Sequence, residues 1–125
     1  MPASDARASA KAISNAMTRL HREHYGRGPN TVRIVVGHDH VIAFLEDIYT
    51  PAERTLIEAG ESEAVTQSRL AFQRAMKGAF VATVEQATGR KVRAFLSQTH
   101  IDPDISCEIF VLEPNGSDPA PERIG

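Results

Sequence analysis

The chain has 125 residues, of which 42% are hydrophobic and 24% are charged. These proportions are typical of one globular domain and exclude a disordered, collagen-like or disulfide-rich chain. Fourteen basic and sixteen acidic side chains give a formal net charge of -2, which argues against general nucleic-acid binding. No apolar run reaches the roughly 20 residues of a membrane span, and the opening residues lack a secretory signal. We therefore expect a cytoplasmic protein that binds no nucleic acid and does not insert into a membrane.

The first predicted element is a helix that starts near Ser4 or Asp5 and stops at Gly26. Its apolar side recurs at spacings of four, three and four residues, which is the period of a helix. Two runs rich in β-branched and apolar residues follow, at Thr31–Val36 and Val41–Leu45. A short polar turn separates them, so they predict a β-hairpin.

The second half repeats this change from helix to hairpin. Thr50–Glu53 combines a hydroxyl cap, a proline and a glutamate at the spacing of a capping box, which predicts the start of a short helix. A longer helix runs from Glu61 to Thr88 and stops at Gly89. The runs Val92–Leu96 and Ile105–Leu112 predict a second hairpin.

These elements predict an α+β fold in the order α-β-β-α-α-β-β. Its four strands form a mainly antiparallel sheet, with the helices packed on one face. One domain then covers residues 1–113. Residues 114–125 are rich in proline, glycine and acidic residues and have little apolar content, so we expect a flexible C-terminal tail.

The predicted strands are apolar on both faces, although a sheet with one face in water should alternate. We therefore expect a second copy of the chain to cover the face without helices. The residues assigned to this dimer interface are Val35, Ile42, Phe44, Phe95, Phe110 and Leu112. The alternative is that the long helix is split across both faces of the sheet.

Polar residues in the predicted loops suggest a binding site. If both hairpin loops reached one end of the sheet, an arginine on a glycine-rich turn would meet histidines and an aspartate. The residues of this candidate ligand site are Arg27, Gly28, His38, His100 and Asp102. No Walker A or GxGxxG pattern is present, and His38 and His40 would point to opposite faces of an extended segment. We therefore assign no cofactor, metal or catalytic residue, and solvated turn histidines remain the alternative.

Two further groups have ordinary structural interpretations. Cys107 is the only cysteine, and an acidic neighbour would raise its pKa, so we interpret it as a packed core thiol. Six basic residues in the second half predict a solvated charged face or a docking surface. They are Arg69, Arg74, Lys77, Arg90, Lys91 and Arg93.

The order of several motifs resembles the MpsC-like family of small bacterial proteins, over roughly residues 10–113. The motifs are Leu20–Pro29, Leu45–Asp47, Thr50–Leu56, Phe95–His100 and Asp102–Asp104. The family takes its name from a proposed sodium-translocating system that generates a membrane potential. The resemblance implies an accessory or regulatory role in ion transport, and it transfers no catalytic residue.

The sequence thus favours a non-enzymatic cytoplasmic homodimer that binds a protein partner, such as a membrane transport component, or a small ligand. The alternative is a small-ligand or metal-dependent enzyme with its site at the hairpin-loop end of the sheet.

Overall fold

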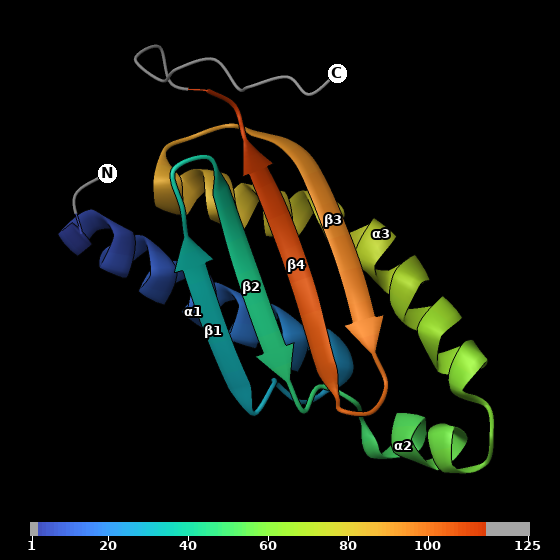
Figure 1. The fold of residues 1–125 in the computed structure, drawn as a ribbon. Coiled ribbons are helices and arrows are strands. Elements are labelled where there is room, and N and C mark those ends of the chain that lie inside the picture. Colours follow the sequence, from blue (N-terminus) through green and yellow to red (C-terminus); the bar gives the residue numbers. More distant parts are fainter. Residues whose placement is uncertain (1–2, 115–125) are drawn as a thin grey trace.

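The computed structural model describes residues 3–114, which form three helices and four strands (Figure 1). The elements are α1 (Ala3–Tyr25), β1 (Thr31–Val36), β2 (His40–Glu46), α2 (Pro51–Glu58), α3 (Ser62–Thr88), β3 (Val92–His100) and β4 (Ile105–Leu112). This order confirms the predicted fold class. The predicted tail lies, from residue 115 onward, outside the described residues.

The predicted helix boundaries have clear local causes. At α2 the Thr50 hydroxyl accepts a hydrogen bond from the Glu53 amide at 3.1 Å, and the Glu53 carboxylate accepts one from the Thr50 amide at 2.8 Å. This reciprocal pair satisfies two amides that would otherwise lack a partner. The long helix α3 ends at Gly89, whose φ of 70° lies in the left-handed region that glycine adopts without steric cost. The first helix begins at Ala3, so Asp5 lies within its first turn.

The strands form one antiparallel sheet in the order β1-β2-β4-β3, with β2 and β4 at its centre. In the central pair, His40 lies opposite Val111 and Glu46 lies opposite Ile105. The turn between β1 and β2 therefore sits beside the end of β4, whereas the turn between β3 and β4 sits beside the end of β2. The two hairpin turns lie at opposite ends of the sheet (Figure 1).

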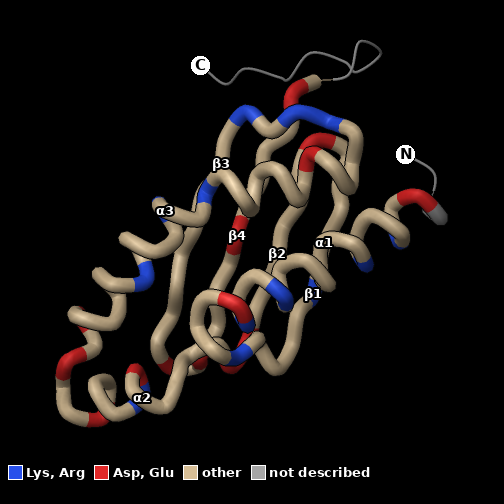
Figure 2. Tube along the Cα trace, turned by 180° about the vertical axis from the view of Figure 1, so that it is seen from behind, with Lys and Arg blue, Asp and Glu red and all other residues tan. Residues whose placement is uncertain are grey.

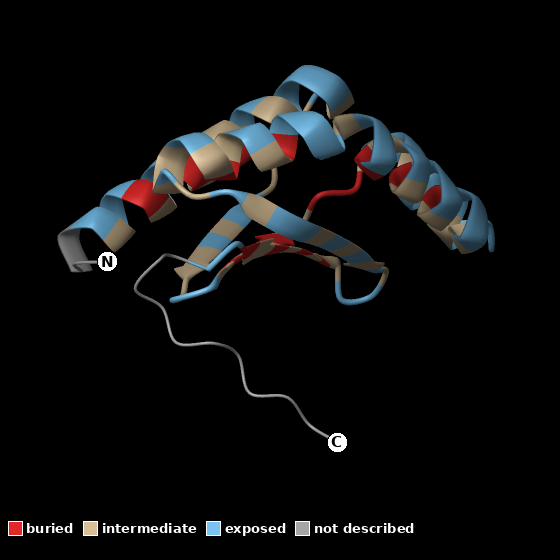
Figure 3. Ribbon diagram, turned by 90° about the horizontal axis from the view of Figure 1, so that it is seen from above, coloured by how far each residue is buried: buried red, intermediate tan, exposed pale blue. Residues whose placement is uncertain are grey.

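All helices among residues 3–114 lie on one side of the sheet (Figure 3). The core fills the space between this layer and the inner face of the strands. Its fully buried members include Ile13 and Met17 of α1, Val65 and Val84 of α3, and Phe110 of β4. We call the opposite face of the sheet, which none of these helices covers, the open face.

The structure reverses the predicted faces of β4. Phe110 and Leu112, which were assigned to the dimer interface, point toward the helices and are only 0% and 3% exposed. Strand alternation places Cys107 on the open face instead, so it is not a core thiol. The pattern was misleading because the inward set of β4 also contains two polar residues, Ser106 and Glu108.

The predicted position of Phe95 is wrong for a different reason. A register shift between Val92 and Ala94 interrupts the pairing of β3 with β4. Such an irregularity inserts a residue and inverts the alternation beyond it. Val92 and Phe95 consequently both pack against the core, and the Phe95 ring lies 5.0 Å from the Phe110 ring.

Candidate functional site

Residues 47–50, which connect β2 to α2, are held by side chains from distant segments. Asp104 accepts hydrogen bonds from the amides of Ile48 and Tyr49, at 3.1 and 3.2 Å. Arg27 donates to the carbonyl oxygens of Tyr49 and Asp47, at 2.9 and 3.0 Å, and to the Asp47 carboxylate at 3.1 Å. The backbone of this loop thus gains partners that neither a helix nor a strand supplies.

A buried ion pair lies behind the same loop. Arg69 of α3 is 2% exposed and donates two hydrogen bonds to the Glu53 carboxylate, at 2.7 and 2.5 Å. It also donates to the Ile48 carbonyl oxygen at 3.0 Å, and its guanidinium lies 3.8 Å from the centre of the Tyr25 ring. Arg69 was predicted to lie on a charged surface, and the structure corrects this. Its charge is buried, paired and stacked.

The electrostatics of Glu53 follow from these contacts. Burial alone would raise the pKa of its carboxyl, but the hydrogen bonds from Arg69 and from the Thr50 amide outweigh burial and lower the pKa below its ordinary value. Burial also raises the pKa of Tyr25 to about 12, so that phenol stays neutral beside Arg69. Glu53 therefore stays ionised, and the pair holds opposite charges at neutral pH.

These side chains form one network around residues 47–50, which we call the loop network. Its members are Arg27, Asp47, Glu53, Arg54, Arg69 and Asp104. Arg54 completes it by pairing with both Asp47 and Asp104. Because the arginines and carboxylates bind one another and the loop backbone, the network fixes the position of α2.

The structure does not gather the five predicted ligand residues. Arg27 belongs to the loop network. At the same end of the sheet, His100 is the last residue of β3 and Asp102 lies in the turn that follows it. His38 lies in the other hairpin turn, at the opposite end, where Arg90 donates to its carbonyl oxygen. Gly28 packs against α1, where an added Cβ would lie 3.2 Å from Thr18 Cγ2. The antiparallel pairing of β2 with β4 makes the predicted convergence geometrically impossible.

At this end of the sheet, two side chains lie within hydrogen-bond distance of backbone carbonyl oxygens. The Tyr49 hydroxyl donates to the His100 carbonyl oxygen at 3.2 Å, and a ring nitrogen of His100 lies 2.8 Å from the Pro103 carbonyl oxygen. Among residues 3–114, no group of three or more histidine, cysteine or acidic side chains is arranged to hold a metal ion.

The open face is a second candidate surface. Three of the six residues predicted for the dimer interface, Val35, Ile42 and Phe44, lie on it. Strand alternation adds Leu96, Ile105, Cys107, Ile109 and Val111. Leu96 is 53% exposed. Between His40 and Glu46, and along all of β4, the central strands place no charged side chain on this face.

A family model described as "MpsC: Na+-translocating membrane potential-generating system (MpsC)" matches residues 6–114. The chain belongs to the MpsC family. This match confirms the resemblance seen in the sequence, and membership associates the chain with ion transport. No curated protein and no solved structure matches the chain. None of the helices within residues 3–114 is long and apolar enough to cross a membrane.

The segments that carry the MpsC resemblance meet at the loop network. Arg27, Asp47, Glu53 and Asp104 come from four of the five segments, and the fifth supplies the His100 carbonyl oxygen. These motifs therefore mark a structural junction. The partner of Glu53 was missed because Arg69 lies outside all five segments, 16 residues further along the chain.

Proposed function

We propose that this MpsC-family chain is a non-enzymatic accessory protein of an ion-transport system and works as a homodimer joined through its open face. The observation that carries the proposal is the apolar, uncharged centre of that face. A small antiparallel sheet with one face in water normally alternates apolar and polar residues. Here the middle of the open face is apolar although no described helix covers it, as in a sheet covered on both sides.

A second copy of the chain suits this face because of where its charges lie. In a twofold dimer the same patch meets itself, so a charged centre would bring like charges together. The charged strand residues on this side lie at its margin, with Arg33 on the edge strand β1 and Glu46 at the end of β2. The Arg33 guanidinium lies 4.3 Å from the centre of the Phe44 ring, so this edge-strand charge is stacked on an aromatic ring of the open face.

The rival function, a ligand- or metal-dependent enzyme at the hairpin-loop end, needed His38 and His100 to converge. They lie at opposite ends of the sheet. Arg27, a further residue of that predicted site, bonds the backbone of residues 47 and 49 in the loop network.

The test is a pair of matched leucine substitutions. Leu96→Asp places a charge on the open face, whereas Leu56→Asp changes a residue of similar exposure, 41%, on α2. Because an unpaired buried carboxylate costs several kcal/mol, Leu96→Asp should raise the dimer dissociation constant by about 10-fold or more. Sedimentation velocity across micromolar concentrations should show wild type and Leu56→Asp as dimers and Leu96→Asp shifted toward monomer.

The same proteins test the accessory role in their native cells. After mild crosslinking, a tagged wild-type chain and Leu56→Asp should recover an ion-transport subunit from the membrane fraction, and Leu96→Asp should recover less. A wild-type monomer at these concentrations would overturn the homodimer. Recovery of no transport subunit by the dimeric wild type would overturn the accessory role.

A further inference from the structure

The strand β3 forms one edge of the sheet, and its outer side pairs with no other strand of residues 3–114. It is 9 residues long, from Val92 to His100. An edge strand presents a row of backbone N–H and C=O groups that point away from the sheet, so it can pair with a further strand. Pairing at this edge uses the backbone and the helix-covered side of β3, so it does not depend on the dimer proposed for the open face.

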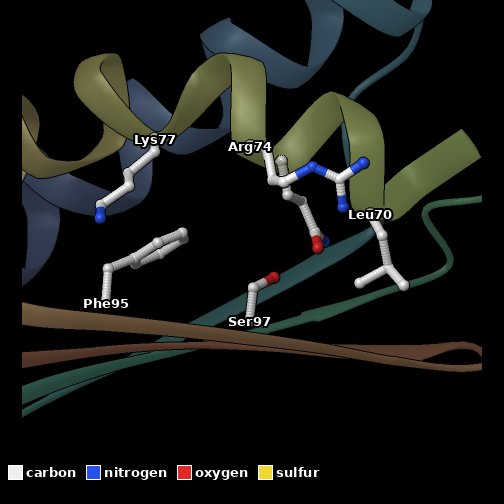
Figure 4. A pocket seen from close by; sticks show the side chains of 6 residues that line it. Leu70, Arg74, Lys77, Phe95 and Ser97 are labelled. Atoms are coloured by element: carbon white, nitrogen blue, oxygen red, sulfur yellow. The ribbon is translucent and has the colours of Figure 1, made fainter. Parts of the chain in front are cut away.

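A cavity of about 270 Å³ lies between β3 and α3, on the helix-covered side of the sheet. In Figure 1, α3 begins beyond the outer edge of β3 and then passes behind the sheet. Figure 4 shows Phe95 and Ser97 rising from the strand toward the helix, which carries the other lining residues. Those residues are Leu70, Gln73, Arg74 and Lys77. The edge of β3 is thus bordered by a cavity in which an added strand can place a side chain.

The size and the walls of this cavity suit an apolar side chain. Leu70 and Phe95 supply apolar walls. Phe95 also packs against the core, where its ring lies 5.0 Å from the Phe110 ring, so this wall is held in place. At about 30 Å³ for each water-sized group, the cavity holds roughly nine non-hydrogen atoms. The side chain of a leucine, isoleucine or phenylalanine contains fewer atoms than that.

The exposed charges along this edge are basic. Arg74 and Lys77 are exposed on α3, and neither forms an ion pair within residues 3–114. Arg93 is exposed on β3, a strand that contains no acidic residue. Figure 2 shows basic and no acidic positions along the middle of α3 and on β3. A segment that carries acidic side chains therefore complements this edge.

We propose that β3 binds an extended acidic segment of a partner protein as an added strand, with one apolar side chain in the cavity and acidic side chains at Arg74 and Lys77. Alternate side chains of a strand point to the same face, so the apolar and acidic residues of this segment lie two positions apart. Main-chain hydrogen bonds provide affinity, and the cavity and the basic residues provide specificity. A second copy of this chain fits the edge less well, because it brings the same basic residues against one another.

Titration of the isotope-labelled full chain with short peptides, followed by two-dimensional NMR, tests this inference. The probe is the peptide Thr-Asp-Thr-Leu-Thr-Asp-Thr, whose leucine and aspartates share one side of an extended strand. It should bind saturably, with a dissociation constant of about 1 mM or lower. The rearranged peptide Thr-Thr-Asp-Leu-Asp-Thr-Thr places the leucine and the aspartates on opposite sides, so it should bind about 5-fold more weakly. A peptide with lysine in place of both aspartates should bind about 10-fold more weakly or not at all.

The same spectra and two charge-reversed variants locate the site. Binding should shift the amide signals of β3 and leave those of β1, the other edge strand, unchanged. The double variant Arg74→Glu and Lys77→Glu should bind the aspartate peptide about 10-fold more weakly and the lysine peptide more tightly than wild type does. The control is Arg7→Glu with Lys11→Glu, which reverses two exposed charges on α1 and should bind both peptides as wild type does. Far-UV circular dichroism confirms that each variant is folded.

Four results would overturn the inference. The first is that the aspartate peptide does not bind wild type at about 1 mM. The second is that the double variant on α3 binds both peptides as wild type does. The third is that the peptide shifts the signals of β1 instead of β3. The fourth is that the signals of β3 shift on dilution without peptide, which would assign this edge to a second copy of the chain. Sedimentation of Leu96→Asp tests the open face separately.

Discussion

Replacing Arg69 with methionine is expected to lower the free energy of unfolding by about 3–5 kcal/mol, the usual cost of breaking a buried ion pair. The substitution leaves the Glu53 carboxylate, whose side chain is only 15% exposed, without its cation. It also removes the donor to the Ile48 carbonyl oxygen and the cation above the Tyr25 ring. Urea unfolding at pH 7, followed by far-UV circular dichroism, measures the loss.

A surface arginine provides the matched control. Arg19 pairs with Glu23 one turn away on α1, and both side chains are more than half exposed. Arg19→Ala should change the free energy of unfolding by less than about 0.5 kcal/mol. Adding Glu53→Gln to Arg69→Met should recover part of the loss, because no buried charge then remains. A loss below about 1 kcal/mol for Arg69→Met would contradict the importance of the loop network.

The second large effect concerns Glu108, and it depends on pH. Burial is the main cause that raises the pKa of this carboxyl from 4.5 to about 7, although the hydroxyls of Ser97 and Ser106 lower it in part. The folded chain then binds this proton more tightly than the unfolded chain does. The contribution of the Glu108 carboxyl to the free energy of unfolding is therefore fully present below pH 4.5 and is lost as the pH rises through about 7.

Glu108→Gln removes this dependence. A pKa raised from 4.5 to about 7 corresponds to roughly 3 kcal/mol of unfavourable free energy once the group is ionised. The variant should be about 2–3 kcal/mol more stable than wild type at pH 8 and nearly equal to it at pH 4. Urea unfolding at both pH values measures the difference.

Glu63→Gln is the matched control, because Glu63 is an exposed residue in the first turn of α3. Its difference from wild type should show no such rise between pH 4 and pH 8. If Glu108→Gln and wild type differ by the same amount at both pH values, the buried carboxylate does not titrate as described.

Much of the fold could be predicted because local signals agree with it. The strand bounds of Thr31–Val36 and Ile105–Leu112 match the structure, and so does the capping box at Thr50. These features depend on neighbours in sequence, namely β-branched runs and hydroxyl caps. The extension of β3 to His100 was missed because Ser97 and Gln98 are polar.

The faces of β4 could not be predicted from hydropathy. Nearly every position of this strand is apolar, and the two clearly polar ones, Ser106 and Glu108, point into the protein. A rule that places apolar residues inside therefore selects the wrong set. The pairing of Glu108 with Ser97 and its contact with Gln73 depend on the sheet register and on how α3 crosses it. Neither the register nor the crossing of α3 can be predicted from neighbouring residues in the sequence.

In the candidate sites too, features that depend on local sequence were predicted and features that depend on distant contacts were not. Glu53 was recognised as a cap, but its partner Arg69 looked like a surface base because charge is usually exposed. Gln73 was overlooked because polar side chains are usually exposed, although it is only 7% exposed. The predicted meeting of His38 with His100 failed because the antiparallel arrangement of β2 and β4 sends the two turns to opposite ends. The burial of Arg69, the burial of Gln73 and the separation of His38 from His100 all depend on how distant segments pack together.

The most direct test of the open face as the self-association surface uses Cys107, the only cysteine and a residue of that face. Its alkylation by iodoacetamide is followed at pH 8 while the protein concentration crosses the dimer dissociation constant. The rate should fall in proportion to the dimer fraction, and Leu96→Asp should keep the monomer rate. A Cys107 rate that stays constant while sedimentation shows a dimer would place the subunit contact elsewhere and contradict the account.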